Sequence, residues 1–224
     1  MIYRNYEKRM LDFTISLLSL LFFSPLFVVL IVTGTVKLKG NPFFVQGRPG
    51  KNGSIFKLVK FRTMTNEKDK SGELLPDDKR LNSYGRFLRS TSLDEIPELL
   101  NIVKGEMAIV GPRPLAEIYL PYYTKEERHR HDVRPGLTGL AQVNGRNNLS
   151  WDDKIAYDLE YVKNISFLGD LRIIARTVKK VLTHEGIGQG EDRPVSLHIE
   201  RENWTITENG AVRPSGAMKS NNHS

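Results

Sequence analysis

The sequence predicts a mostly helical α+β fold: a re-entrant helix-break-helix membrane anchor, then a β-hairpin and surface amphipathic helices around a small core. Three observations predict it. A long uncharged apolar run lies near the start of the 224-residue chain, a strand-turn-strand pattern follows it, and most of the later periodicity is helical. This length suits one domain of ordinary size plus an appendage.

The net charge of +7 is unevenly distributed along the chain. Residues 1–66 contain ten Lys and Arg against two acids, a net charge of +8, so the remaining residues sum to −1. A basic excess that brackets the apolar run argues against nucleic-acid binding and indicates anionic lipid or an anionic substrate near a membrane. The chain has no cysteine, which excludes disulfides and thiolate metal sites and suits a reducing, cytosolic compartment.

The apolar run extends from Phe13 to Val36 without a charge. As one helix it would reach about 36 Å, enough to cross a hydrocarbon core of about 30 Å. Pro25 must kink or break such a helix, and the Ser24 hydroxyl can bond a freed carbonyl. The break leaves two legs of about 18 Å, each matching one leaflet. Basic residues flank both ends, so both ends look cytoplasmic: Arg4, Lys8, Arg9, Lys37 and Lys39. These features favour a re-entrant anchor, and a single-pass helix stays open.

A hairpin is expected next, with strands at Phe43–Gln46 and Ile55–Met64 around a Pro-Gly-Lys-Asn-Gly reversal. Lys60 and Arg62 fall on one strand face, which either meets an anion or is simply solvated. Residues 65–80 are polar and turn-rich, as in a surface loop.

The rest of the chain is predicted to be helical with glycine- and proline-rich loops. The 170–182 segment is basic and amphipathic, and either lies on a membrane surface or packs a core face. From His184 periodicity is lost, and disorder is expected for residues 207–224. The expected helices are 82–89, 93–103, 115–130, 152–164 and 170–182.

Asp94 and Glu95 are the leading candidates for chemistry. They are expected at a helix start, where backbone N–H groups stabilise negative charge and also attract phosphate. One reading is a capping box, Ser92 with Glu95, although Pro97 fits that register poorly. The other is a carboxylate nucleophile with an adjacent Mg²⁺ ligand.

Arg113 lies in the sequence GPRP, between two prolines that restrict its backbone. A guanidinium held in this way suits bidentate phosphate binding, while a structural turn is the alternative.

The loop 133–146 supplies Arg134, Arg146 and glycines that allow close anion approach, a weak signal. HRHD (129–132) resembles a metal cluster only superficially, and WDD (151–153) is expected to cap the next helix.

Four segments together resemble the bacterial sugar transferases, the monotopic polyprenyl-phosphate phosphoglycosyl transferases, in their small PglC-like form. They are FVQGRPGKNGSIFKLVKFRTM, STSLDEIPELLNIVKGEMAIVGPRPL, HRHDVRPGLTGLAQVNGRN and SWDDKIAYDLEYVKNISFLGDLRIIARTVKKVL. The resemblance covers residues 1–187. It implies a re-entrant anchor at 1–40, a phosphoglycosyl transferase catalytic domain at 41–187 and a C-terminal extension at 188–224 with a disordered tail.

The resemblance also implies a reaction. A UDP-sugar gives its phosphosugar to undecaprenyl phosphate and releases UMP, through a covalent intermediate on Asp94. Glu95 would help Asp94 hold Mg²⁺, Arg113 would bind phosphate, and Lys60 would face the same anionic site. Arg146 and Asp158 are similar to family positions that contact nucleotide or support the structure.

Ser24 and Pro25 match the break of the family's membrane element, which enters and leaves on the cytoplasmic face of the bacterial inner membrane. An N-acetylated amino sugar is expected, without excluding galactose or glucose, and the oligomeric state is not predicted. Two other functions stay open: a membrane-associated glycosyltransferase that moves sugar without phosphate, and a non-enzymatic basic lipid-binding module.

Overall fold

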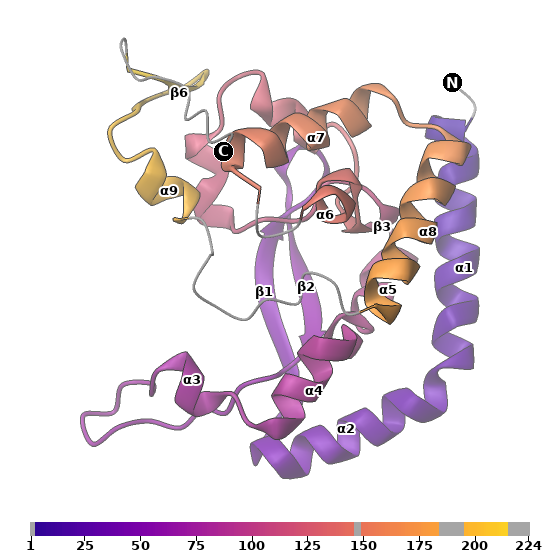
Figure 1. Ribbon diagram of the computed structural model, residues 1–224, viewed down its shortest axis with the longest axis vertical. Helices are drawn as coiled ribbons and strands as arrows, with labels where there is room; N and C mark the ends of the chain where they lie inside the picture. Colours follow the sequence, from indigo (N-terminus) through magenta and orange to yellow (C-terminus); the bar gives the residue numbers. More distant parts are fainter. Residues whose placement is uncertain (1–2, 146–148, 184–194, 215–224) are drawn as a thin grey trace.

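The computed structural model describes residues 3–145, 149–183 and 195–214. It confirms a mostly helical α+β fold in which every sheet has two strands. In Figure 1 the first two helices meet at an angle along one side and the base of the molecule, and an upright hairpin occupies its centre. The C-terminal segment lies at the opposite upper corner.

The apolar run forms two helices, α1 (Lys8–Phe22) and α2 (Ser24–Leu38), bent by 64° at the break. Ser24 Oγ donates to the Leu21 carbonyl at 2.8 Å, as expected, and Pro25 sits in the first turn of α2, where its missing N–H costs nothing. In the described residues no single helix is long and apolar enough to span a membrane, whereas the bent pair reaches that length and composition together.

The start of α1 is docked onto the folded domain. Arg9 donates to the Ile102 and Val103 carbonyls at 2.6 and 2.8 Å, and Lys8 binds Asp170 at 2.7 Å. These two cations of the basic flank are therefore engaged within the protein itself. The first turns of α1, preceded by a π-helical turn (Tyr3–Glu7), belong structurally to the domain.

One face of α2 packs against α4 (Ser83–Thr91), where Leu30, Phe61 and Leu88 form a buried cluster. Tyr84 Oη donates to the Leu30 carbonyl at 2.9 Å. The opposite face is exposed and apolar, as expected for contact with lipid: Val28, Val29, Val32 and Val36.

The hairpin pairs β1 (Phe43–Pro49) with β2 (Ile55–Phe61) in antiparallel register, with Phe43 opposite Phe61. The first strand is longer than predicted and the second ends earlier. The Asn101 side chain continues the ladder on the free edge of β2, because it accepts from Val59 N–H at 3.1 Å and donates to the Lys57 carbonyl at 2.8 Å.

The predicted 93–103 helix is broken into a 3-10 turn (η3, Leu93–Glu95) and a helix (α5, Glu98–Lys104). Pro97 occupies the cap position of α5, which stops the helix from starting earlier. The capping box is absent, since Ser92 is left-handed at φ 56° and its side chain caps nothing. Before this, the predicted loop contains one short helix, α3 (Asp77–Arg80).

Residues 115–130 are not one α-helix, as predicted, but two 3-10 segments, η4 (Glu117–Tyr122) and η5 (Glu127–His131). Pro121 lies inside η4, where an α-helix would need its N–H. Two short parallel strands flank this region, β3 (Ala108–Val110) and β4 (Gly136–Thr138). Further helices follow in the chain, of which α8 contacts both strands: α6 (Leu140–Asn144), α7 (Trp151–Lys163) and α8 (Phe167–Leu182).

The C-terminal segment is ordered where the structure describes it. It contains α9 (Leu197–Glu200) and a hairpin of β5 (Thr205–Thr207) and β6 (Gly210–Val212). Disorder was therefore the wrong prediction for residues 207–214, and residues 215–224 lie outside the described part of the chain.

Candidate active site

Four charged side chains from separate elements meet beside the hairpin. Lys60 of β2 lies 2.9 Å from Glu95 of η3 and 2.8 Å from Glu98, the first residue of α5. Arg113, just after β3, lies 2.7 Å from the same Glu95 oxygen, Oε1. The structure thus brings together three of the predicted site residues, with Asp94 directly beside them in η3.

The two glutamates of this cluster have opposite pKa shifts. Burial opposes the charge of Glu95, but Arg113 and Lys60 outweigh it and hold its pKa well below the usual range. Burial and the negative charge of Glu95 raise the pKa of Glu98, which is only 2% exposed. Glu95 is therefore the ionised partner of both cations at neutral pH.

Asp94 differs from its neighbours because its carboxylate has no ion-pair or side-chain hydrogen-bond partner among the described residues. Burial, followed by the charge of Glu95, raises the pKa of Asp94 to about 6. Such a carboxylate is still ionised at neutral pH but more basic than an ordinary aspartate. Its oxygens are free to attack an electrophile that the adjacent cations hold.

A buried ion pair between Arg130 and Asp158 fixes the backbone of Arg113. Arg130 donates to the Arg113 carbonyl at 2.8 Å and binds Asp158 Oδ2 through two nitrogens at 2.7 and 3.0 Å. Asp158 is 3% exposed, so of its two expected roles the structural one fits and direct substrate contact does not. This pair thus holds the backbone from which the Arg113 guanidinium reaches Glu95.

Sequence reasoning missed Glu98 and Arg130. Glu98 follows Glu95 by three residues, a spacing that places both on one side of a helical turn. For Arg130 the signal was Asp158 itself, which lies on the apolar face of α7 with Ile155 and Tyr161 and requires a buried cation.

The other candidates lie elsewhere. Arg134 donates to the Gly105 carbonyl at 2.7 Å and helps to cap α5. Arg146 lies outside the described residues. Ser150, rather than the acids of WDD, caps α7. In HRHD, burial and the charge of Arg130 lower the pKa of His131 to about 3, and the described residues contain no group of three metal-ligating side chains.

Magnesium remains compatible with the donors present. Mg²⁺ takes oxygen ligands and often binds through one or two carboxylates, with substrate phosphates and water supplying the rest. Asp94 is unengaged, and both cations bind the same oxygen of Glu95. These two carboxylates could hold Mg²⁺ together with ligands from a phosphorylated substrate, since the part of the chain that the structure describes has no group of three metal-ligating side chains here.

An unpaired, basic carboxylate next to two fixed cations is an arrangement suited to binding and reacting with a phosphorylated substrate. The profile of the family "Bacterial sugar transferase" matches residues 3–184, and the chain belongs to this family.

Named relatives agree with this assignment. The chain is 48% identical over 200 residues to the uncharacterized sugar transferase EpsL of Bacillus subtilis, covering 88% of this chain and 95% of that one. It is 37% identical to the UDP-glucose:undecaprenyl-phosphate glucose-1-phosphate transferase of Caulobacter vibrioides, over 80% of this chain and 71% of that one. It is 36% identical to the undecaprenyl-phosphate galactose phosphotransferase of Salmonella typhimurium, over 81% and 42%.

Proposed function

We propose that this sugar transferase moves a sugar-1-phosphate from a UDP-sugar to undecaprenyl phosphate through a covalent intermediate on Asp94, as the first membrane step of glycan assembly. The observation that carries the proposal is the free Asp94 carboxylate beside the Lys60–Glu95–Arg113 cluster. The names of the Caulobacter and Salmonella relatives supply the acceptor.

The proposed reaction has two displacements. An Asp94 oxygen bonds to the β-phosphorus while the bond from that phosphorus to the bridging diphosphate oxygen breaks, and UMP leaves with the oxygen. A phosphate oxygen of undecaprenyl phosphate then attacks the same phosphorus, which breaks the acyl phosphate bond and restores the Asp94 carboxylate. Atoms and charges balance without a redox partner.

The surrounding side chains have distinct parts in this scheme. Arg113 and Lys60 bind the phosphoryl oxygens and stabilise the charge that moves onto the leaving group. Glu95 keeps both cations oriented before substrate arrives. A Mg²⁺ ion held by Asp94 and Glu95 with substrate oxygens would neutralise the diphosphate and the departing UMP.

The sugar is the least constrained part of the proposal. Sequence resemblance favours an N-acetylated amino sugar, whereas the names of two relatives specify glucose and galactose. A panel of UDP-GlcNAc, UDP-GalNAc, UDP-galactose and UDP-glucose, compared by kcat/KM, separates these possibilities.

We further propose that the bent pair α1–α2 is re-entrant, with the catalytic side chains on the cytoplasmic face of the inner membrane. In this geometry a soluble UDP-sugar and the headgroup of a membrane lipid reach the same carboxylate. Labelling near Arg4 and near Lys39 in oriented vesicles should find both on one face, and opposite faces would reject the idea.

The chemistry is tested by the identity of the nucleotide product. Purified protein with Mg²⁺, undecaprenyl phosphate and a UDP-sugar should release UMP; release of UDP would instead indicate sugar transfer without phosphate. Without acceptor, about one equivalent of UMP should appear and the phosphosugar should be found on Asp94 by mass spectrometry.

The nucleophile is tested by Asp94→Asn. It should lower UMP release by about a thousandfold or more, since the amide cannot attack phosphorus, while membrane association stays unchanged. Asp132→Asn, which alters an exposed acid paired with His129, is the matched control and should stay within about twofold. An Asp94→Asn variant that still releases UMP would reject Asp94 as the nucleophile, whereas a wild type that releases no nucleotide from any UDP-sugar would favour the non-enzymatic lipid-binding alternative.

A further inference from the structure

The C-terminal segment, residues 195–214, lies outside the family match, which ends at residue 184. It is nevertheless built into the domain. Leu197 is fully buried in a cluster with Tyr123 and Trp151, and the indole of Trp151 donates to the Val195 carbonyl at 2.7 Å. Ala211 N–H donates to the Tyr123 carbonyl at 3.0 Å.

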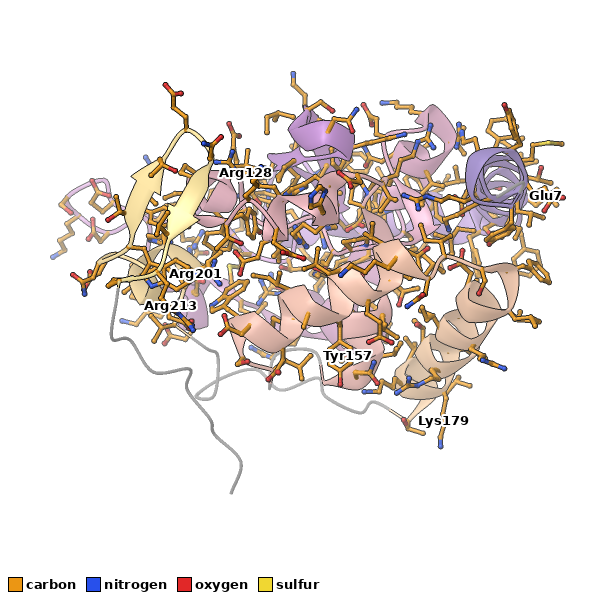
Figure 2. The ribbon with its side chains drawn as sticks, turned by 90° about the horizontal axis from the view of Figure 1, so that it is seen from above. Glu7, Arg128, Tyr157, Lys179, Arg201 and Arg213 are labelled. Carbon is orange, nitrogen blue, oxygen red and sulfur yellow. The ribbon has the colours of Figure 1, made fainter. Side chains whose placement is uncertain are left out.

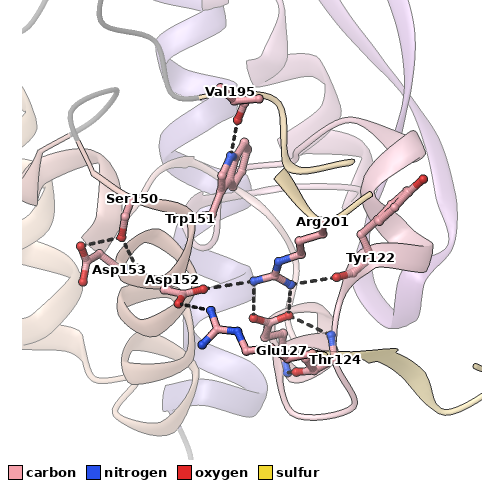
Figure 3. Close-up of polar contacts among 10 residues, drawn as sticks. Tyr122, Thr124, Glu127, Ser150, Trp151, Asp152, Asp153, Val195 and Arg201 are labelled. Atoms are coloured by element: carbon pink, nitrogen blue, oxygen red, sulfur yellow. Dashed lines mark hydrogen bonds and ion pairs between the residues drawn. The ribbon is translucent and has the colours of Figure 1, made fainter. Parts of the chain in front are cut away.

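Arg201 is the centre of these contacts (Figure 3). Its side chain is 1% exposed and binds Glu127 through both terminal nitrogens, at 2.6 and 2.8 Å. It also donates to the Tyr122 carbonyl at 2.8 Å and to Asp152 at 3.2 Å. A buried guanidinium with a bidentate carboxylate partner fixes the two elements that it joins.

The two acids that Arg201 binds belong to the elements that support the candidate active site. Glu127 lies in η5, three residues before Arg130, and Asp152 lies in α7, six residues before Asp158. Arg201 therefore joins η5 and α7 at the periphery of the domain. Arg130 and Asp158 join the same two elements next to Arg113.

Arg213 provides a natural comparison within the same segment. It binds the other oxygen of Asp152 at 3.0 Å and, like Arg201, lies over the Trp204 ring. Figure 2 shows Arg201 and Arg213 together at the end of the molecule opposite Glu7. No hydrogen bond or ion pair joins Arg213 to η5 in the described residues, so it shares the surroundings of Arg201 but not its bridge.

We propose that residues 195–214 form a clasp that positions Arg113 for catalysis through Arg201. Arg201 holds η5 against α7, η5 carries Arg130, and Arg130 holds the Arg113 carbonyl at 2.8 Å. Arg201 is thus a positioning residue that touches no substrate. The catalytic part of this inference rests on the proposed function.

The test compares Arg201→Lys, which keeps the charge but loses the fork, with Arg213→Ala in the full-length protein. Arg201→Lys should lower kcat/KM for UMP release by roughly tenfold, because small displacements of an anion-binding group are costly. Arg213→Ala should stay within about twofold. Both are measured well below their melting temperatures, with folded fractions checked by circular dichroism. If Arg201→Lys does not fold, Glu127→Gln tests the same bridge.

A double-mutant cycle distinguishes positioning from general destabilisation. If Arg201 acts through Arg113, the loss caused by Arg201→Lys should largely disappear in an Arg113→Lys background. An equal loss in both backgrounds would overturn the proposal. A loss of kcat/KM in Arg201→Lys that is no greater than the loss in Arg213→Ala would also overturn it.

Hydrogen exchange gives a readout that does not depend on activity. The Gly136 amide donates to the Pro112 carbonyl at 2.9 Å and reports on the backbone next to Arg113. Its exchange should be faster in Arg201→Lys and unchanged in Arg213→Ala; unchanged exchange in Arg201→Lys would reject the clasp. If the wild type releases no UMP from any UDP-sugar, the proposed function fails while this measurement still decides the clasp.

Discussion

At the scale of single residues, Asp94 is buried beside the negatively charged Glu95, and both features disfavour its own negative charge. Its pKa of about 6 in the folded protein exceeds the usual value of 3.8, so the unfolded chain binds fewer protons between these values. Stability therefore falls as pH rises through this window, and the full penalty is present above about pH 6. Asp94→Asn should raise the unfolding free energy of the substrate-free protein by about 1–3 kcal/mol at pH 7.5. Urea denaturation at pH 7.5 and pH 4 checks this; a gain of equal size at both would contradict it.

For Asp158, in contrast to Asp94, loss of the negative charge is expected to destabilise the protein. Asp158→Asn leaves the fully buried Arg130 without its counter-charge, which should cost about 3–5 kcal/mol of unfolding free energy. Because Asp158 is buried away from the four charged side chains of the candidate site, the KM of the folded fraction for UDP-sugar should change less than kcat. A large rise in KM with normal stability would instead restore Asp158 as a substrate contact.

At the scale of elements, the exposure of α8 bears on its two sequence interpretations, a core-facing helix or a helix on a membrane surface. Ile173 and Asp170 face the core, but Leu171 and Val178, two apolar residues of the same amphipathic segment, are about half exposed. Exposed apolar residues beside basic ones favour contact with a membrane surface. Leu171→Gln with Val178→Gln should leave thermal stability nearly unchanged and reduce vesicle retention in flotation. Ile173→Gln is the control that should destabilise the fold, and unchanged retention of the double variant would argue against the membrane reading.

Elements with local signals could be predicted and those set by distant contacts could not. The break at Ser24-Pro25 follows from proline geometry, and the hairpin follows from alternation and a glycine-rich reversal. The 93–103 and 115–130 segments look helical by periodicity, yet Pro97 and Pro121 interrupt them. Disorder was wrong for residues 207–214 because their order comes from partners such as Asp152, 61 residues away from Arg213.

The candidate site shows the same division. Asp94, Glu95 and Arg113 stand out because their neighbours in sequence restrict or polarise them. The ion pairs that complete the site join residues 35 and 28 positions apart, Lys60 with Glu95 and Arg130 with Asp158. The spacing of Glu98 from Glu95 and the acid on the apolar face of α7 are only indirect signals, because periodicity does not say which distant residue each side chain meets; the folded structure supplies these partners.

At the scale of the whole molecule, the two basic flanks of the apolar run have different surroundings. Arg9 binds carbonyls at the end of α5, whereas Lys37 and Lys39, at the end of α2, are exposed and free to meet anionic headgroups. Removing Lys37 and Lys39 together should weaken partitioning into anionic over neutral vesicles by about thirtyfold, at about 1 kcal/mol for each basic residue. Folding stability should not change.

Arg9→Gln should show the reverse pattern. Loss of its bonds to the Ile102 and Val103 carbonyls should lower unfolding free energy by about 1–3 kcal/mol, with partitioning unaltered. Chemical denaturation in detergent and partitioning between vesicles with and without anionic lipid measure the two effects on both variants. Equal losses of partitioning in both would mean that the start of α1 also meets headgroups. If Arg9→Gln loses only stability and the variant without Lys37 and Lys39 loses only partitioning, the membrane holds this protein through α2 and the break. The first turns of α1 then secure the anchor to the catalytic domain.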